Sequence, residues 1–137
     1  MSLYALERQV AISAVTRACA LTSSVFTKLV KSEILTKEDR TPVTIADLSA
    51  QALINTMLGS AFPSDPIVGE EDASDLRGTG EAQRLMQERI TDLANDALTR
   101  PLSSDERKEW GLGNGKSTDE LLDTIDRGSH AGGKKGR

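Results

Sequence analysis

The feature that most constrains the fold of this chain is its shortage of strands beside several helical patterns. Only two segments, at about 42–44 and 66–70, have the short Pro-bounded apolar pattern of a strand. Two strands are too few for a stable sheet, because a lone hairpin is marginal and isolated parallel strands do not stand alone. The helices nevertheless have apolar faces that need a sheet to cover them. The sequence therefore predicts a fragment of a larger α/β or α+β protein.

Apolar residues recur at helical spacing through the first part of the chain. They follow steps of three and four over 3–31, and a second stripe, which widens this face, consists of Ala11, Val15, Thr22, Phe26 and Val30. The pattern predicts a long amphipathic packing helix. An interruption is expected near 21–24, where polar residues of low helix propensity cluster. Residues 33–40 are expected to form a loop.

Two more helices are predicted in the second half of the chain. The first covers 81–98, where apolar residues again follow helical steps. A surface loop anchored by Trp110 follows it. The second helix is short, begins with the capping box of Ser117 and Glu120, and ends at Gly128.

Composition excludes several classes of protein. The 137 residues suffice for one domain, and 37% apolar residues, 28% charged residues and a net charge of -4 are ordinary for a soluble protein. With 3% aromatic residues the chain lacks the stacking platforms of single-strand binders, so no nucleic-acid partner is expected. The single Cys19 favours a reducing compartment and is expected to be a small buried hydrophobe. No apolar window of membrane-spanning length is recognised, so no membrane is expected and the predicted location is cytoplasmic.

An acidic stretch over 65–72 is the first candidate for chemistry. A short apolar pair and a glycine run into three consecutive acids, Glu70, Glu71 and Asp72. A buried strand there would deliver carboxylates to its carboxyl edge, and hard cations such as Mg²⁺ take oxygen ligands. The alternative is a solvated acidic turn after an edge strand.

Asp47 also has two interpretations. A helix is predicted from Thr44 to Gly59, and Thr44 with Asp47 forms a capping-box pattern at its start. In this structural role Asp47 stabilises the helix N-terminus and its dipole. In the functional role it is a carboxylate that faces the same metal site as Glu70.

Several linked motifs give the sequence a family resemblance. They are Thr41-Pro42-Val43-Thr44-Ile45-Ala46-Asp47, Gln51, Ala61-Phe62-Pro63 and Ile67-Val68-Gly69-Glu70-Glu71. With them the chain resembles the opening third to two-fifths of the inositol monophosphatase superfamily, and in particular the fungal and plant 3'(2'),5'-bisphosphate nucleotidases. The nucleotidases are favoured by Leu6-Glu7-Arg8 with Leu21-Thr22, by the long insert after Glu71, and by the closing Ile125-Asp126-Arg127-Gly128 with its basic glycine-rich tail.

The resemblance implies a fold and an activity. The fold is a layered α/β/α sugar-phosphatase fold, in which residues 1–137 form the N-terminal helices and first strands of the first α/β domain. The activity is that of a Mg²⁺-dependent phosphomonoesterase that removes the 3'-phosphate of adenosine 3',5'-bisphosphate to give AMP. Such hydrolases are lithium-sensitive and are associated with sulfur assimilation. Preference among this substrate, its sulfated analogue and inositol phosphates stays open.

The resemblance also assigns site residues. It implies that Glu70 is a metal ligand, that Asp47 is the catalytic proton acceptor for the attacking water, and that Glu71 lies behind the direct ligands. Substrate-binding residues are not identified. The family continues after the basic tail with a strand carrying Asp-Pro-Ile-Asp-Gly-Thr, and this motif is missing here.

One glutamate and one aspartate are too few for metal-assisted hydrolysis, which needs several carboxylates around its cations. The chain is therefore expected to be competent only with the C-terminal remainder of the same enzyme as its partner, with the break in the tail at 129–137. The alternative is a self-standing helical interaction module without catalytic activity.

Overall fold

The computed structural model describes residues 3–30 and 41–128, and this part of the chain is helical. Its elements in chain order are α1 (Ala5–Val25), the π-helix η1 (Phe26–Val30), α2 (Thr41–Ala61), the short 3-10 turn η2 (Ser74–Leu76), α3 (Glu81–Thr99), a second 3-10 turn η3 (Lys108–Trp110) and α4 (Thr118–Arg127). The loop expected at 33–40 and the tail at 129–137 lie outside the described residues.

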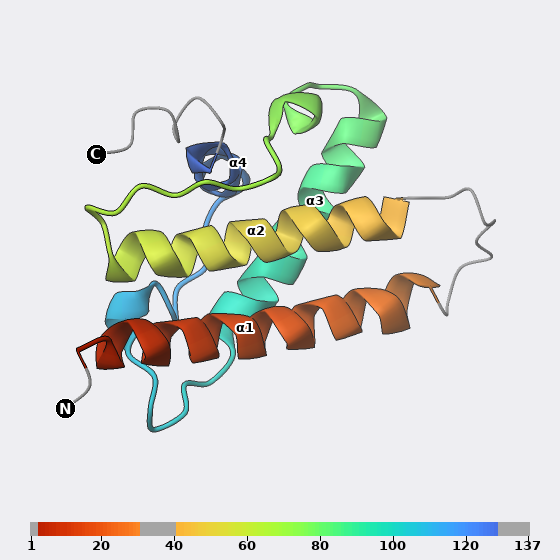
Figure 1. Cartoon of the computed structure of the whole chain (residues 1–137). Helices are drawn as coiled ribbons and strands as arrows, with labels where there is room; N and C mark the ends of the chain where they lie inside the picture. The colour runs from red at the N-terminus through yellow and green to blue at the C-terminus, as the bar shows by residue number, and fades with distance from the viewer. Residues whose placement is uncertain (1–2, 31–40, 129–137) are drawn as a thin grey trace.

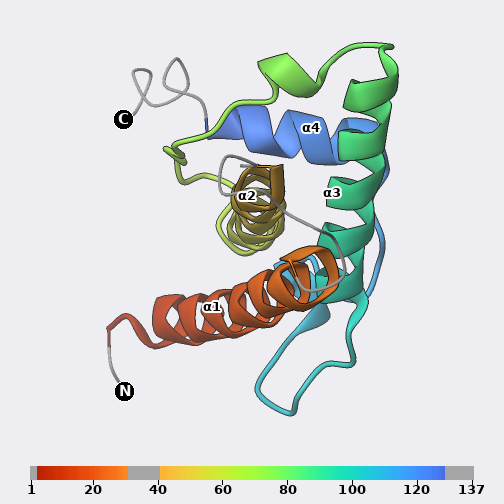
Figure 2. The same cartoon turned by 90° about the vertical axis from the view of Figure 1, so that its right-hand side faces the viewer.

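The helices pack in two directions around α2 (Figures 1 and 2). Helices α1 and α2 lie side by side and run in opposite directions, and α4 packs against the other side of α2. Helix α3 crosses behind this row and contacts all three of the other helices. Buried apolar side chains from every one of these helices form one core, in which Ile45, Leu53, Met57, Ile90, Leu98, Leu121 and Ile125 are fully buried.

Helix α1 confirms the first predicted helix but not its predicted faces. The buried residues of α1 include Val10, Ala14, Leu21 and Val25 from the main apolar stripe. The second stripe is exposed where its burial is described. The helix also runs without interruption to Val25, because the polar residues at 22–24 lie at its surface or edge and cost little there.

Helix α2 begins three residues earlier than predicted. It starts at Thr41 and ends at Ala61, so the strand predicted at 42–44 is wrong. Pro42 lies in the first turn, where a proline is tolerated because the first backbone N–H groups have no helical partner. Since Thr44 now lies inside the helix, the predicted capping box of Thr44 and Asp47 is also wrong.

The strand predicted at 66–70 is absent as well. This segment has no regular secondary structure, and Val68 is 70% exposed. Its path is fixed by one backbone hydrogen bond, in which Gly69 N donates to the Gly128 carbonyl oxygen over 2.5 Å. A single extended segment has no neighbouring strand within the described ranges to complete a ladder. The predicted α/β fold concerns a longer protein and is not decided by this part of it.

The second half of the chain follows the sequence predictions closely. Helix α3 has nearly the predicted bounds, and Trp110 is buried and anchors the loop after α3. Helix α4 begins with the predicted capping box, in which Ser117 Oγ accepts from Glu120 N and the Glu120 carboxylate accepts from Ser117 N. Gly128 ends this helix.

Two expectations from composition need correction. Cys19 is exposed and is not a buried hydrophobe, because it projects from the side of α1 that faces away from the core. The segment Ala5–Lys28 is long and apolar enough to cross a membrane by length and composition, and 33% of its apolar window is buried. A core helix of a soluble protein and a signal sequence pass the same test.

Candidate functional site: an acidic cluster beside α2

The structure brings the predicted site residues to one region. Asp47 lies on the exposed side of α2, one turn before Gln51. Glu70 and Glu71 lie in the irregular segment between α2 and η2, where Glu70 is exposed and Glu71 is half-buried. The acids are thus held by a helix and by an adjoining loop, and not by the end of a strand.

Gln51 ties the acidic segment to α2. Its Nε2 donates to the Glu71 carbonyl oxygen over 2.7 Å, and its Oε1 accepts from Glu71 N over 3.0 Å. The same Nε2 donates to the Ile125 carbonyl oxygen at the end of α4 over 3.2 Å. A side chain at Gly69 would meet the Gln51 amide at 2.8 Å, so the absence of one lets the segment approach α2. These contacts fix the backbone of Glu71 beside the helix that carries Asp47.

A second clamp holds the far end of the acidic segment. The Asp126 carboxylate accepts from Ala73 N over 2.7 Å and from Arg77 Nη2 over 2.7 Å. Asp72 Oδ1 accepts from the Ser74 hydroxyl and from Ser74 N, the latter over 2.9 Å, and the hydroxyl first and the backbone N–H second lower the pKa of Asp72. The segment is therefore bonded to α2 on one side and to α4 on the other.

The acids influence one another electrostatically. The pKa of Glu71 is raised, first by partial burial and then by the negative charges of Glu70, Asp47 and Asp72. Repulsion between like charges disfavours the ionised form of a carboxyl group, and a bound cation would relieve it. The charge of Asp47 on α2 is thus one of the causes that raise the pKa of Glu71 in the acidic segment.

The donor chemistry of this cluster fits a hard cation, but the number of donors does not complete a site. Carboxylate oxygens are what Mg²⁺ prefers, and it needs one or two of them beside water and phosphate oxygens. Among the described residues no group of three or more His, Cys, Asp or Glu side chains is arranged to hold a metal. A cavity of about 220 Å³ adjoins the cluster and is lined by Glu71, Asp72 and Asp75 with residues from α2 and α3. The acids are open to further ligands from outside this part of the chain.

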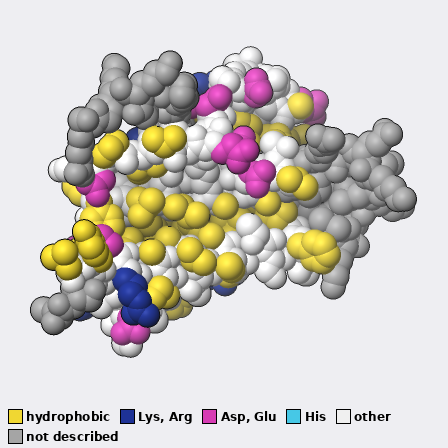
Figure 3. All heavy atoms as spheres, in the orientation of Figure 1, with side chains coloured by type: hydrophobic (Ala, Val, Ile, Leu, Met, Phe, Trp, Pro, Cys, Tyr) yellow, Lys and Arg dark blue, Asp and Glu magenta, His cyan; other side chains and the backbone are white. Residues whose placement is uncertain are grey.

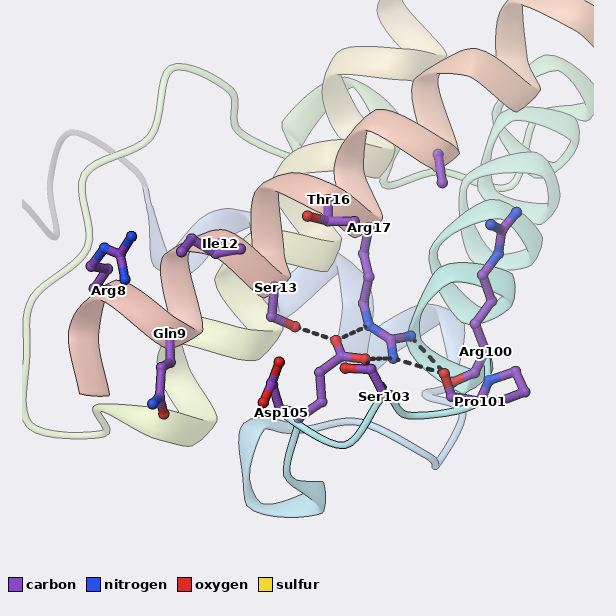
Figure 4. Close-up of a pocket in the computed structure, with 12 residues that line it drawn as sticks. Arg8, Gln9, Ile12, Ser13, Thr16, Arg17, Arg100, Pro101, Ser103 and Asp105 are labelled. Carbon is purple, nitrogen blue, oxygen red and sulfur yellow. Dashed lines mark hydrogen bonds and ion pairs between the residues drawn. The ribbon is translucent and has the colours of Figure 1, made fainter. Parts of the chain in front are cut away.

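A second polar centre, which the sequence did not predict, lies between α1 and the loop after α3 (Figure 4). Arg17 and Glu106 form a two-point ion pair, with Nε to Oε2 at 2.7 Å and Nη2 to Oε1 at 2.8 Å. Ser13 also donates to Glu106. Arg17 Nη1 donates to the Ala97 carbonyl oxygen over 2.5 Å at the end of α3. This network borders a cavity of about 500 Å³.

The charges of the second centre neutralise each other. The Arg17 guanidinium is the main cause that lowers the pKa of Glu106 to about 2, helped by Ser103 N and the Ser13 hydroxyl. No side-chain nitrogen or oxygen that is buried in the described part of the chain lacks a hydrogen-bond partner. Arg17 and Glu106 thus satisfy each other and join α1 to the loop, which is a structural role.

Two sequence signals could have located these contacts. Arg17 falls on the main apolar stripe of α1, three residues after Ala14 and four before Leu21, so a charge there indicated a buried partner. Gln51 follows Asp47 by four residues and so shares its side of the helix. The identity of the partners, Glu106 and the Glu71 backbone, depends on contacts between distant parts of the chain.

Comparison with known proteins gives the chain clear relatives. It is 44% identical over 135 residues to a 3'(2'),5'-bisphosphate nucleotidase of Schizosaccharomyces pombe, a match that covers 96% of this chain and 36% of the relative. It is 41% identical over 134 residues to the enzyme of that name from Emericella nidulans, covering 98% of this chain and 36% of the relative. For 3'(2'),5'-bisphosphate nucleotidase 1 of Arabidopsis thaliana the identity is 38% over 136 residues, with the same coverage of 98% and 36%.

These matches confirm the resemblance found in the sequence. No family model matches the chain. The relatives are phosphatases by name, and the chain spans a little over one third of the length of each. The match runs through both the acidic segment and the long insert that follows it.

Proposed function

We propose that this chain, a homologue of the 3'(2'),5'-bisphosphate nucleotidases, supplies one part of a Mg²⁺-dependent phosphomonoesterase. The complete enzyme removes the 3'-phosphate of adenosine 3',5'-bisphosphate to give AMP. In it the chain forms the N-terminal portion of the first domain of a layered α/β/α fold. A cytoplasmic location and the absence of a nucleic-acid partner belong to the same proposal.

The observation that carries the proposal is the acidic cluster. The relatives are named for a phosphatase activity, and the chain matches them along almost its whole length. Within that match, Glu70 and Glu71 lie near Asp47 of another element, and the pKa of Glu71 is raised first by partial burial and then by the charges of Glu70, Asp47 and Asp72. Repulsion between neighbouring carboxylates is offset when a cation binds between them, so such clusters are candidates for cation-binding sites.

We assign the roles as follows. Glu70, which is exposed, would be a ligand of Mg²⁺, and the metal, when bound, would activate a water and neutralise charge on the phosphate. Asp47, which is exposed on α2, accepts the proton of the attacking water. Glu71 positions the segment through its backbone bonds to Gln51 and adds negative charge behind the metal ligand.

The remaining ligands must come from the other two thirds of the enzyme. The described residues offer no group of three metal-binding side chains, and phosphate-ester hydrolysis on metal ions uses more carboxylates than this cluster contains. The partner of this chain is therefore the C-terminal remainder of the same enzyme. Substrate selectivity is assigned to that remainder.

A chimera tests the proposal on a complete enzyme. This chain replaces the matching 36% of the Schizosaccharomyces pombe relative, and turnover of adenosine 3',5'-bisphosphate is measured at saturating Mg²⁺. We expect turnover within about tenfold of the relative. A chimera that melts cooperatively but has no turnover contradicts the proposed function.

Two variants of the chimera test the assigned roles. Glu70→Gln is expected to weaken Mg²⁺ affinity and turnover together, and Asp47→Asn to lower turnover by about 10²–10⁴ at saturating Mg²⁺, since this is the usual contribution of a positioned base. Glu88→Gln and Asp92→Asn, which change exposed acids on α3, are the matched controls. Parent-like turnover of Asp47→Asn with an altered melting temperature would return Asp47 to a structural role.

One observation favours the alternative of a self-standing helical module. The described helices share a single core and leave no buried side-chain polar group unsatisfied. Thermal and urea unfolding of the 137-residue chain alone distinguishes the two. An interaction module unfolds cooperatively as a monomer, whereas part of a larger domain is expected to unfold with little cooperativity and to bind a hydrophobic dye such as ANS.

A further inference from the structure

The Gln51 side chain is the support that α2 provides for the acidic segment. Its amide bonds to both backbone groups of Glu71, because Oε1 accepts from Glu71 N over 3.0 Å and Nε2 donates to the Glu71 carbonyl oxygen over 2.7 Å. A neighbouring antiparallel strand exchanges the same two bonds with one residue. A carboxylate lacks the donor for this arrangement, and an ammonium group lacks the acceptor. Gln51 therefore takes the place of a strand partner for Glu71.

Glu70 lies between two restrained points of the backbone. Gly69 N donates to the Gly128 carbonyl oxygen at the end of α4, and Glu71 is bonded to Gln51 on α2. The Glu70 side chain is exposed, and Figure 3 shows acidic side chains at the surface beside α2. The backbone on either side of Glu70 is thus held, while its carboxylate is open to solvent.

The acidic segment, α2 and α4 meet closely at Gln51. The Gln51 Nε2 also donates to the Ile125 carbonyl oxygen over 3.2 Å, so one amide contacts all three. A Cβ atom at Gly69 would lie 2.8 Å from the Gln51 amide carbon, and one at Gly128 would lie 3.1 Å from Gly69 N. A displaced Gln51 side chain would therefore release the Glu71 backbone from α2 and loosen its junction with α4.

Position is decisive for a carboxylate that binds Mg²⁺. The ion requires near-octahedral geometry with oxygen ligands at about 2.0–2.1 Å, so a displaced carboxylate binds it poorly. Residues 66–70 have no regular secondary structure, so no ladder of hydrogen bonds holds them. Groups that lie behind metal ligands typically change metal affinity by about 10–100-fold when they are replaced.

We propose that Gln51 is a positioning residue for Glu70. This rests on the proposed function, in which Glu70 binds Mg²⁺. Gln51 acts through the backbone: it fixes Glu71, and the position of Glu71 limits where the preceding carboxylate can reach. The property that Gln51 sets is the affinity for Mg²⁺, whereas the rate at saturating Mg²⁺ depends on Asp47.

Removal of the Gln51 amide tests the proposal in the chimera with the Schizosaccharomyces pombe relative. Gln51→Met keeps the length of the side chain and removes both bonds to Glu71. We expect the binding of Mg²⁺ alone, measured by calorimetry, to weaken by about 10–100-fold. Turnover at saturating Mg²⁺ should fall by less than about threefold, because the bound metal then holds Glu70 in place. Asp47→Asn has the opposite signature, since it lowers turnover at saturating Mg²⁺.

Asn55→Leu is the matched control. Asn55 lies one turn after Gln51 on α2, is buried, and donates through Nδ2 to the Thr124 carbonyl oxygen of α4 over 3.1 Å. It joins the same two helices, and its replacement also removes a bond from a side chain to a backbone carbonyl. Asn55→Leu should lower the melting temperature and keep the Mg²⁺ affinity of the parent. Equal weakening of Mg²⁺ binding in Gln51→Met and Asn55→Leu overturns the proposal, because helix packing alone would then explain it.

Hydrogen exchange in the metal-free chimera reports on the backbone itself. The amide of Glu71, which donates to Gln51, is followed in its peptide by mass spectrometry. We expect this amide to exchange at least about tenfold faster in Gln51→Met and at the parent's rate in Asn55→Leu. Either an unchanged exchange rate or an unchanged Mg²⁺ affinity in Gln51→Met contradicts the positioning role.

Gly69→Ala perturbs the same contact from the other side and decides the matter if Gln51→Met does not fold. Its Cβ would displace the Gln51 amide, so Mg²⁺ binding should weaken here too. The control is Gly78→Ala, whose Cβ would make ordinary contact with Gln83 at 3.5 Å and which should bind Mg²⁺ like the parent. Because Gln51→Met and Gly69→Ala break one contact, their effects on affinity should combine to less than the product of the two. Parent-like Mg²⁺ binding of Gly69→Ala, or fully independent effects, refutes the role of Gln51.

Turnover of the parent chimera is a separate readout. A parent chimera that binds Mg²⁺ but has no turnover contradicts the proposed function, and the Mg²⁺ affinities of the variants still decide the role of Gln51. An active chimera in which Gln51→Met keeps the parent's affinity contradicts the positioning role alone. A folded parent chimera that binds no Mg²⁺ overturns both.

Discussion

Glu106 and Glu71 are partly buried carboxylates with opposite electrostatic surroundings. Glu106 faces the Arg17 guanidinium at 2.7 Å and accepts further hydrogen bonds, so its pKa falls to about 2. The pKa of Glu71 is raised, first by partial burial and then by the negative charges of Glu70, Asp47 and Asp72. The Glu106 carboxylate has a counter-charge within the chain, whereas the Glu71 carboxylate is surrounded by charges of its own sign.

The difference separates a structural centre from a candidate functional one. The Arg17 and Glu106 pair joins α1 to the loop after α3. Removal of either member would destabilise the fold, because it leaves the other charge buried without a partner. The acids around Glu71 are held in place by backbone bonds through Gln51 and Asp126, which position them without neutralising them. Maintained repulsion is a cost to stability, and perturbed carboxylates of this kind cluster at functional sites.

The largest expected effect comes from removing the cation of the structural centre. Arg17→Met keeps the apolar stem but leaves Glu106 buried without its partner, which typically costs about 3–5 kcal/mol. Urea unfolding at pH 7 measures the loss. As a control, Arg77→Met breaks solvent-exposed pairs with Asp123 and Asp126 and should cost only about 0.2–1 kcal/mol per pair. Equal losses of unfolding free energy for the two variants would contradict the structural role assigned to the buried Arg17 and Glu106 pair.

Acid should weaken the Arg17 and Glu106 ion pair by protonating the Glu106 carboxylate. Because the folded pKa lies at about 2, below the ordinary value of 4.5, the stabilisation is present above pH 4.5 and is lost as the pH falls toward 2. The total contribution is at most about 3.5 kcal/mol, since one unit of pKa corresponds to about 1.4 kcal/mol. Unfolding free energies between pH 2 and 6 measure it. Glu106→Gln should flatten this part of the pH profile, and an unchanged profile would contradict the assignment.

The smallest expected effect has the opposite sign and lies at Glu71. A raised carboxyl pKa means that ionisation disfavours the folded state, so the penalty is present above the folded pKa and disappears below the unfolded one. Glu71→Gln at pH 7 should therefore leave stability unchanged or raise it by about 0.5 kcal/mol, because the residue is only partly buried. Melting temperatures of parent and variant test this. A clear loss of stability would show that the Glu71 carboxylate has a favourable partner.

Local signals in the sequence predicted those elements whose ends are fixed by short-range bonds. The capping box of Ser117 and Glu120 and the terminator Gly128 gave the bounds of α4, because these contacts join residues a few positions apart. The start of α2 was predicted wrongly because Pro42 is compatible both with a strand and with a first helical turn. Residues of the candidate site were named from motifs, but their support by a helix and a clamped loop was not foreseen.

The sequence by itself determined that α1, α2, α3 and α4 are helices and that the chain is related to bisphosphate nucleotidases, since periodicity, caps and motifs are written in consecutive residues. The tertiary structure alone decided which of two apolar stripes on α1 faces the core, because both satisfy helical spacing. It also paired Arg17 with Glu106, and it set Asp47 beside Glu71 through Gln51. Charges acquire their pKa values from such neighbours, so only three-dimensional packing distinguishes the carboxylate that Arg17 neutralises from the one surrounded by other acids.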